Sequence, residues 1–174
     1  HARGGQWVTT NYTNVTTATD PRRTSGLDFP TFTLYPVAGA NILGGESYAI
    51  GNPTRLMEAA AYYRPMAGTF GIMELQPGQV NWGAVNPQPV PGAVGMWIWH
   101  AYAGGASLLS SYRYRHPIRG SEMYHEGIVG TDGVTLSRGG REFVEAMAAV
   151  RTVMRRPGPR AGEPSRMAAR RTGL

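Results

Sequence analysis

Apolar and polar positions follow two different periods along this chain, and the changes of period predict its secondary structure. Runs rich in β-branched and aromatic residues predict four strands, at residues 6–12, 27–37, 68–76 and 107–115. Stretches with helical apolar spacing predict three helices, at residues 52–68, 91–106 and 137–154. A helix-start or turn signal, Asp20-Pro21, lies between the first two strands. The chain therefore alternates β and α elements.

The order of these elements predicts an α/β fold with a parallel sheet, because parallel neighbours need a crossover that a helix usually supplies. Four such units fit either a small doubly wound domain or half of an eight-fold barrel. In both architectures, functional residues gather just past the C-terminal ends of the strands. The polar residues at those places are Asn11, Tyr35, Glu74 and the loop after Arg115.

The positive charge of the chain is concentrated at its C-terminal end. The net charge is +6, and the seven arginines and one glutamate from Arg151 onward account for all of it. Residues 155–174 are rich in Arg, Pro and Gly, a composition that buries too little apolar surface to fold. We therefore predict one folded domain at residues 1–154 and a disordered basic tail at residues 155–174.

Several classes of protein are not indicated by this sequence. It contains no cysteine, which excludes disulfides and thiolate metal sites. It has no run of about 18 apolar residues that could span a bilayer, and no Gly-rich phosphate loop or serine nucleophile motif. We therefore expect no membrane association and no nucleotide cofactor.

Two residues around the third predicted strand could carry chemistry. Glu74 ends the apolar run GIMEL, where a carboxylate could act as a nucleophile or a general acid. The alternative is a buried Glu74 paired with an arginine. Trp82 lies in the loop QPGQVNWG and could form an apolar platform for a sugar ring or a base. The alternative for Trp82 is that it only packs this loop against the protein.

The segment GSEMYHEG places Glu122 and His125 three residues apart after the fourth predicted strand. Two ligands without a third or fourth are a weak signal for a metal site. A sugar-binding pair fits better, because a carboxylate accepts bonds from hydroxyl groups while a neutral histidine donates or accepts one more. The alternative is a solvated turn.

The nearby segment SYRYRHPIRG interleaves Tyr and Arg, which superficially suggests stacking on nucleic-acid bases. If the strand continued through it, alternation would place Tyr112 and Tyr114 on one face and Arg113 and Arg115 on the other. That arrangement argues against a nucleic-acid partner.

Taken together, MELQPGQVNWGAVNPQPVPG, WIWHAYAGGASLLSSYRYR and GSEMYHEGIVG resemble the second half of the catalytic barrel of glycoside hydrolase family 42, the β-galactosidases. VTTNY and LDFPTFTLYP resemble the fifth and sixth barrel strands of that family, so the likeness runs from about residue 7 to residue 148. It implies a partial (β/α)8 TIM barrel in which strands five to eight and their helices surround a parallel sheet.

The resemblance also implies roles for individual residues. Glu74 matches the catalytic nucleophile, and Trp82, Glu122 and His125 match residues that bind galactose. Tyr35 falls where related barrels often hold a tyrosine near the nucleophile. No metal or cofactor takes part in this chemistry. For the full-length enzyme the resemblance implies a β-galactoside substrate, a homo-oligomer (a trimer) and a cytoplasmic location.

One departure from the family pattern limits the expected activity. Retaining hydrolysis needs a second carboxyl as acid and base, which in the family is the Glu of an Asn-Glu pair after strand four. The 174 residues contain no Asn-Glu pair, and the family's zinc-binding cysteines are absent too. We therefore expect a fragment of a retaining β-galactosidase that is inactive alone. The alternatives are a non-catalytic galactose-binding remnant and a nucleic-acid binder that uses the basic tail.

Overall fold

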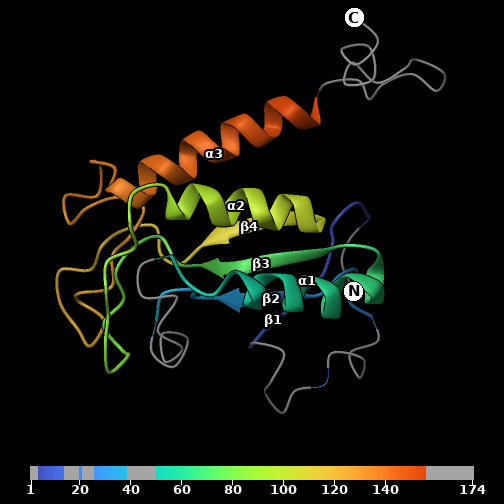
Figure 1. Cartoon of the computed structure of the whole chain (residues 1–174), viewed down its shortest axis with the longest axis horizontal. Helices are drawn as coiled ribbons and strands as arrows, with labels where there is room; N and C mark the ends of the chain where they lie inside the picture. The colour runs from blue at the N-terminus through green and yellow to red at the C-terminus, as the bar shows by residue number, and fades with distance from the viewer. Residues whose placement is uncertain (1–3, 14–19, 21–25, 39–49, 156–174) are drawn as a thin grey trace, which may run out of the picture.

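The protein alternates short strands with three helices (Figure 1). The computed structural model describes residues 4–13, 20, 26–38 and 50–155. In chain order its elements are β1 (Asn11–Tyr12), β2 (Thr31–Leu34), α1 (Pro53–Ala67), β3 (Phe70–Leu75), α2 (Ala93–Gly104), β4 (Ala106–Ser111) and α3 (Arg138–Met154). The predicted helix-start or turn signal at Asp20-Pro21 and the predicted tail fall outside the described residues, apart from Asp20 and Arg155.

The four strands form one parallel sheet in the order β1-β2-β3-β4. Thr33 lies opposite Glu74 in the register between β2 and β3. Because all four strands run the same way, their C-terminal ends meet at one edge of the sheet. The loops that follow β3 and β4 gather at this edge, at the left of Figure 1. The predicted parallel α/β fold is therefore confirmed.

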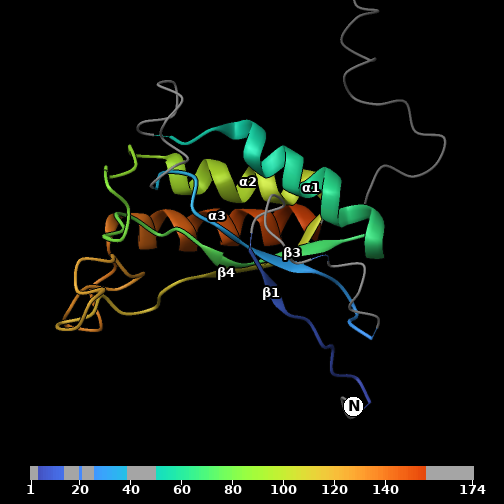
Figure 2. The ribbon, with the colours of Figure 1, turned by 90° about the horizontal axis from the view of Figure 1, so that it is seen from below.

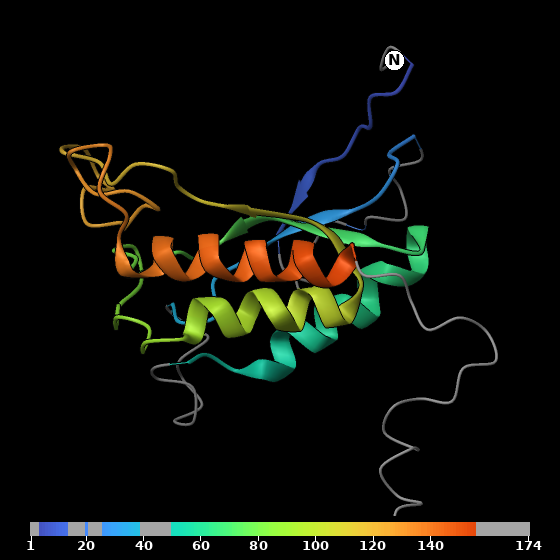
Figure 3. The same ribbon diagram turned by 90° about the horizontal axis from the view of Figure 1, so that it is seen from above.

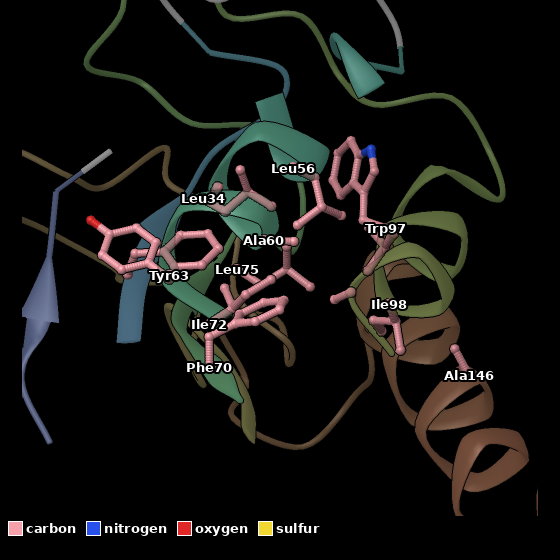
Figure 4. Close-up of a cluster of buried hydrophobic side chains, with 14 of the residues drawn as sticks. Leu34, Leu56, Ala60, Tyr63, Phe70, Ile72, Leu75, Trp97, Ile98 and Ala146 are labelled. Atoms are coloured by element: carbon pink, nitrogen blue, oxygen red, sulfur yellow. The ribbon is translucent and has the colours of Figure 1, made fainter. Parts of the chain in front are cut away.

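All three helices lie against the same face of the sheet (Figures 2 and 3). The hydrophobic core fills the space between the two layers (Figure 4). Phe32 from β2 stacks between Tyr63 of α1 and Phe70 of β3, with ring centroids 4.9 and 5.6 Å away. The other sheet face carries no helix in the described part of the chain, as expected for a segment of a barrel wall.

The helix boundaries follow local capping signals. The side chain of Asn52 accepts a hydrogen bond of 2.9 Å from the amide of Thr54, and Gly68 ends α1 in the left-handed conformation with φ 75°. Ser137 caps α3 in the same way through the amide of Gly140. The three predicted helices are confirmed to within two residues at each end.

All four strands are shorter than predicted, because their ends depend on partners far away in the sequence. β1 has only two residues. β4 ends at Ser111, and past this point the carbonyl oxygens of Arg113 and Tyr114 accept bonds from the amides of Ile128 and Val129, at 2.9 and 2.7 Å. The strand therefore does not extend to residue 115, and the predicted opposite faces of Tyr112 and Arg113 are wrong, because both side chains contact Glu122.

No helix in the described part of the chain is long and apolar enough to cross a membrane.

Candidate active site

A pocket of about 480 Å³ opens at the C-terminal edge of the sheet. It is lined by Thr33, Tyr35, Glu74, Trp82, Tyr112, Glu122 and His125. The lining residues come from the ends of β2 and β3 and from the loops after β3 and β4. All five residues singled out from the sequence therefore lie together, although they span 90 positions of the chain.

Glu74 sits near the end of β3, half-buried, and each of its carboxylate oxygens accepts one hydrogen bond from a neutral donor. The amide of Asn11, from β1, donates to Oε1 at 2.8 Å. The hydroxyl of Tyr35, just past β2, donates to Oε2 at 2.9 Å. Asn11 is itself oriented by Thr33, whose hydroxyl donates to Oδ1 at 3.0 Å.

These contacts bear on the alternative in which Glu74 pairs with an arginine. Within the described part of the chain Glu74 forms no ion pair, so the predicted alternative of an arginine partner is wrong there. Two neutral donors hold the carboxylate in place without neutralising its charge. Such a carboxylate can still act as a nucleophile.

Tyr35 acts as a donor because it stays protonated. Its burial and the negative charge of Glu74 raise the pKa of the Tyr35 hydroxyl well above its usual range. The ring of Tyr35 also meets Trp82 edge-on at 5.1 Å and His125 at 5.8 Å. Tyr35 thus connects the nucleophile candidate with two other pocket residues.

The loop that carries Trp82 is anchored by the residues just before it, although the side chain itself stays 51% exposed. The amide of Gln79 donates to the carboxylate of Glu126 at 3.2 Å, and the amide of Glu126 donates to the carbonyl of Gln79 at 2.8 Å. The side chain of Asn81 donates to the carbonyl of Ser121 at 2.7 Å. A fixed loop with a half-exposed indole offers apolar surface to a ligand in the pocket.

Glu122 is part of a compact polar cluster with Tyr112 and Arg113. The hydroxyl of Tyr112 donates to Oε2 of Glu122 at 3.1 Å, and the guanidinium of Arg113 forms an ion pair with the same oxygen. Arg113 also donates to the hydroxyl of Tyr112, and its Cζ lies 4.6 Å from the centre of that ring. The segment does form a turn, and the Glu122 side chain is 39% exposed, but this cluster holds its carboxylate in place.

His125 is completely buried, with the rings of Tyr35 and Tyr112 edge-on beside it. Burial lowers its pKa, and the positive charge of Arg113 acts in the same direction. The charges of Glu122 and Glu74 and the backbone of Tyr112 oppose this shift. Neither ring nitrogen makes a hydrogen bond of regular geometry within the described residues. A neutral imidazole at the pocket wall can give and accept one bond each.

The described residues contain no group of three or more His, Asp or Glu side chains that could hold a metal ion. Within these residues, no third ligand of this kind joins Glu122 and His125 to form a metal site. The surroundings of the pair instead match a ligand rich in hydroxyl groups, because carboxylate, imidazole and aromatic surface lie side by side.

The comparison with known proteins identifies the family of this chain. Residues 2–153 match glycoside hydrolase family 42, described as Beta-galactosidase. The chain belongs to this family. A β-galactosidase of Thermus thermophilus is 33% identical over 132 residues, which cover 71% of this chain and 20% of the relative. BgaH, a β-galactosidase of Haloferax lucentense, is 34% identical over 127 residues, which cover 70% of this chain and 19% of the relative.

Solved structures of family members share the fold. The β-galactosidase of the psychrophilic Marinomonas ef1 superposes with a TM-score of 0.75 at 30% identity, over 87% of this chain and 24% of that one. The enzyme of the haloarchaeon Halorubrum lacusprofundi gives a TM-score of 0.75 at 28% identity, over 84% of this chain and 23% of that one. The predicted partial (β/α)8 barrel is confirmed. The chain spans about a fifth of the length of the curated family 42 relatives that it matches.

Sequence reasoning missed four residues of this family 42 pocket. Thr33 and Tyr112 line it, and Asn11 and Arg113 contact its two carboxylates. The sequence points to Asn11 only as a polar residue at the end of a strand. The strand-end rule could have identified Thr33 in the same way.

Proposed function

We propose that this chain carries the nucleophile side of a retaining β-galactosidase active site, with Glu74 as the nucleophile. The observation that supports this most directly is the pair of neutral hydrogen bonds from Asn11 and Tyr35 to its two carboxylate oxygens. They orient the carboxylate towards a pocket and leave its charge available for attack. Membership of family 42 supplies the substrate class, a terminal β-D-galactoside.

In this mechanism a carboxylate oxygen of Glu74 bonds to the anomeric carbon and the bond from that carbon to the leaving oxygen breaks. The leaving oxygen takes a proton from a second carboxylic acid, which then takes a proton from the water that hydrolyses the galactosyl ester. In retaining enzymes the two carboxyl groups lie about 5 to 5.5 Å apart.

Glu122 is poorly suited to the role of the acid. It is ion-paired with Arg113 and accepts a bond from Tyr112, so these contacts already engage its carboxylate as an acceptor. The resemblance assigns the acid to an Asn-Glu pair, and none occurs among the 174 residues. We therefore propose that this chain alone does not turn over galactosides.

The other pocket residues would position the sugar. The exposed face of Trp82 would carry the apolar face of galactose, while Glu122 accepts bonds from its hydroxyl groups. His125, which also lines the pocket, would supply one further bond from its imidazole. Tyr35 would contact both the nucleophile and the sugar. No metal or cofactor is needed for these steps.

A substrate with a leaving group that departs without protonation tests the nucleophile separately from the missing acid. The purified chain is incubated with 2,4-dinitrophenyl 2-deoxy-2-fluoro-β-D-galactoside and digested for mass spectrometry. We expect one fluorogalactosyl adduct on the peptide that contains Glu74. Glu74→Gln should give no adduct, and the control Glu58→Gln, at an exposed position of α1, should react as the wild type does.

Two outcomes would contradict the proposal. An adduct on another residue would refute Glu74 as the nucleophile. Turnover of nitrophenyl galactoside by this chain, lost in Glu74→Gln, would refute its inactivity in isolation.

A second candidate function is a non-catalytic galactose-binding remnant. It is favoured by the Arg113–Glu122 ion pair, which gives the pocket a binding carboxylate in place of an acid. This candidate predicts galactose binding without any covalent adduct on Glu74. The trimer and the cytoplasmic location of the full-length enzyme are further proposals from family resemblance. Light scattering and cell fractionation of the full-length enzyme would test them.

A further inference from the structure

The two oxygens of the Glu122 carboxylate are used differently. Oε2 receives both the hydroxyl of Tyr112 and the guanidinium of Arg113. Both contacts end on Oε2, so neither of them occupies Oε1 among the described residues. Because an ionised carboxylate can accept about four hydrogen bonds, the second oxygen keeps its capacity for a ligand.

Arg113 is itself held in position from several sides. Its carbonyl oxygen accepts a bond of 2.9 Å from the amide of Ile128, and its guanidinium lies against the ring of Tyr112. Its side chain is 23% exposed and that of Glu122 is 39% exposed, so solvent screens part of this interaction. An arginine with its backbone and side chain both fixed can orient a partner carboxylate.

We propose that Arg113 is a positioning residue for galactose binding, which pairs with one oxygen of Glu122 and leaves the other free for a sugar hydroxyl. This role rests on the proposed function of the pocket. Arg113 does not line the pocket and acts through Glu122 and His125.

The charges around His125 give Arg113 a second effect. The groups that face His125 are the cation Arg113, the carboxylates Glu122 and Glu74, and the rings of Tyr112 and Tyr35. Of the charged groups in the described part of the chain that act on His125, Arg113 is the cation, and it helps to keep the pKa of His125 low. Without it, the two carboxylates favour a protonated His125 that pairs with Glu122. Such a pair would occupy both groups that the sugar needs.

Three variants of the 174-residue chain test this role. Arg113→Met removes the cation, Arg113→Lys keeps a charge without the planar fork, and Arg119→Met removes an exposed arginine of the same loop as a control. NMR follows the titration of the His125 imidazole without ligand, and calorimetry measures the affinity for galactose at pH 6 and pH 8. Circular dichroism shows whether each variant is folded.

We expect Arg113→Met to raise the pKa of His125 and to weaken galactose binding about tenfold at pH 6. Part of this loss should be recovered at pH 8, where His125 is neutral again. Arg113→Lys should keep the pKa of His125 low and bind galactose with intermediate affinity. Arg119→Met should behave like the wild type. If Arg113→Met does not fold, the intermediate affinity of Arg113→Lys is the deciding result.

The possible failures can be told apart. A wild-type chain that binds no galactose would refute the galactose site of the proposed function. If the wild type binds galactose and both Arg113 variants bind it equally tightly, the role of Arg113 is refuted and the galactose site of the proposed function is not. An equal loss of affinity at both pH values, with no change in the titration of His125, would reduce Arg113 to a structural residue and overturn the proposal.

Discussion

The hydroxyl of Tyr35 donates a hydrogen bond of 2.9 Å to Oε2 of Glu74 and so joins the C-terminal ends of β2 and β3. The bond connects residues that are 39 positions apart in the chain. It links the side chain proposed to attack the sugar to a neighbouring strand, so the orientation of the carboxylate depends on the sheet as a whole.

Removing this hydroxyl should slow the reaction of Glu74. A hydrogen bond to a charged group contributes about 1.5 to 3 kcal/mol, so we expect Tyr35→Phe to lower the rate of fluorogalactosyl labelling by about 10- to 100-fold. The rate is measured by intact-protein mass spectrometry. Tyr62→Phe, at an exposed position of α1, is the control. A labelling rate in Tyr35→Phe equal to that of the wild type would show that the bond does not orient the nucleophile.

Trp82 should matter for binding and little for folding. Its side chain is half-exposed and its loop is fixed by other residues, so Trp82→Ala should change the free energy of unfolding by less than about 1 kcal/mol. The galactose affinity, measured by calorimetry, should fall at least tenfold because the apolar platform is lost. Trp99→Ala removes a partly exposed tryptophan of α2 and should leave the affinity unchanged. A large loss of stability in Trp82→Ala would instead support a packing role.

The fold was predictable from the sequence where local chemistry decides it. Asn52 and Gly68 set the ends of α1 through their own side chain and backbone, and the sequence identifies both. The position of Glu74 and Tyr35 at one edge follows from the rule that parallel strands end together. The family resemblance added Trp82 as a third member of the same pocket.

The cluster around Glu122 was not predictable in this way. The end of β4 at Ser111 is set by backbone bonds to residues 128 and 129, and no local signal announces them. Strand alternation therefore predicts opposite faces for Tyr112 and Arg113, although both side chains contact Glu122. The burial of His125 likewise depends on rings from two other segments.

Gln76 joins the loops that follow β2 and β3. Its side chain is fully buried and accepts a bond of 2.9 Å from the amide of Val37. It donates to the carbonyl oxygens of Val37 and Gly78, both at 2.8 Å. Tyr35 and Trp82 lie on the two loops that this amide connects, so Gln76 helps to fix the distance between them.

Gln76→Leu should therefore strongly destabilise the protein. The substitution leaves three backbone groups without their partner in a buried place, which costs about 3 kcal/mol or more. Urea unfolding measures the loss, and Gln6→Leu at an exposed position is the control. A change below about 1 kcal/mol in Gln76→Leu would mean that water replaces the amide and that the two loops are held by other contacts.

His125 should make the stability of the protein depend on pH. Because burial lowers its pKa in the folded state, the unfolded chain binds more protons as the pH falls below about 6.5, the ordinary histidine value. Stability should therefore be highest above that value and fall as the medium becomes more acidic. His125→Gln removes this contribution, so its free energy of unfolding should depend less steeply on pH between about 7 and 5.

The comparison uses urea unfolding at a series of pH values for the wild type, His125→Gln and His100→Gln, which removes an exposed imidazole from α2. The carboxyl groups are the same in all three proteins, so their contribution to the pH dependence of stability cancels in the differences. An unchanged slope in His125→Gln would mean that the folded protein takes up the proton as readily as the unfolded chain. In that case the effect of the carboxylates Glu122 and Glu74 on the pKa of His125 would outweigh the opposite effects of burial and Arg113. The imidazole in the pocket would then be a cation below neutral pH.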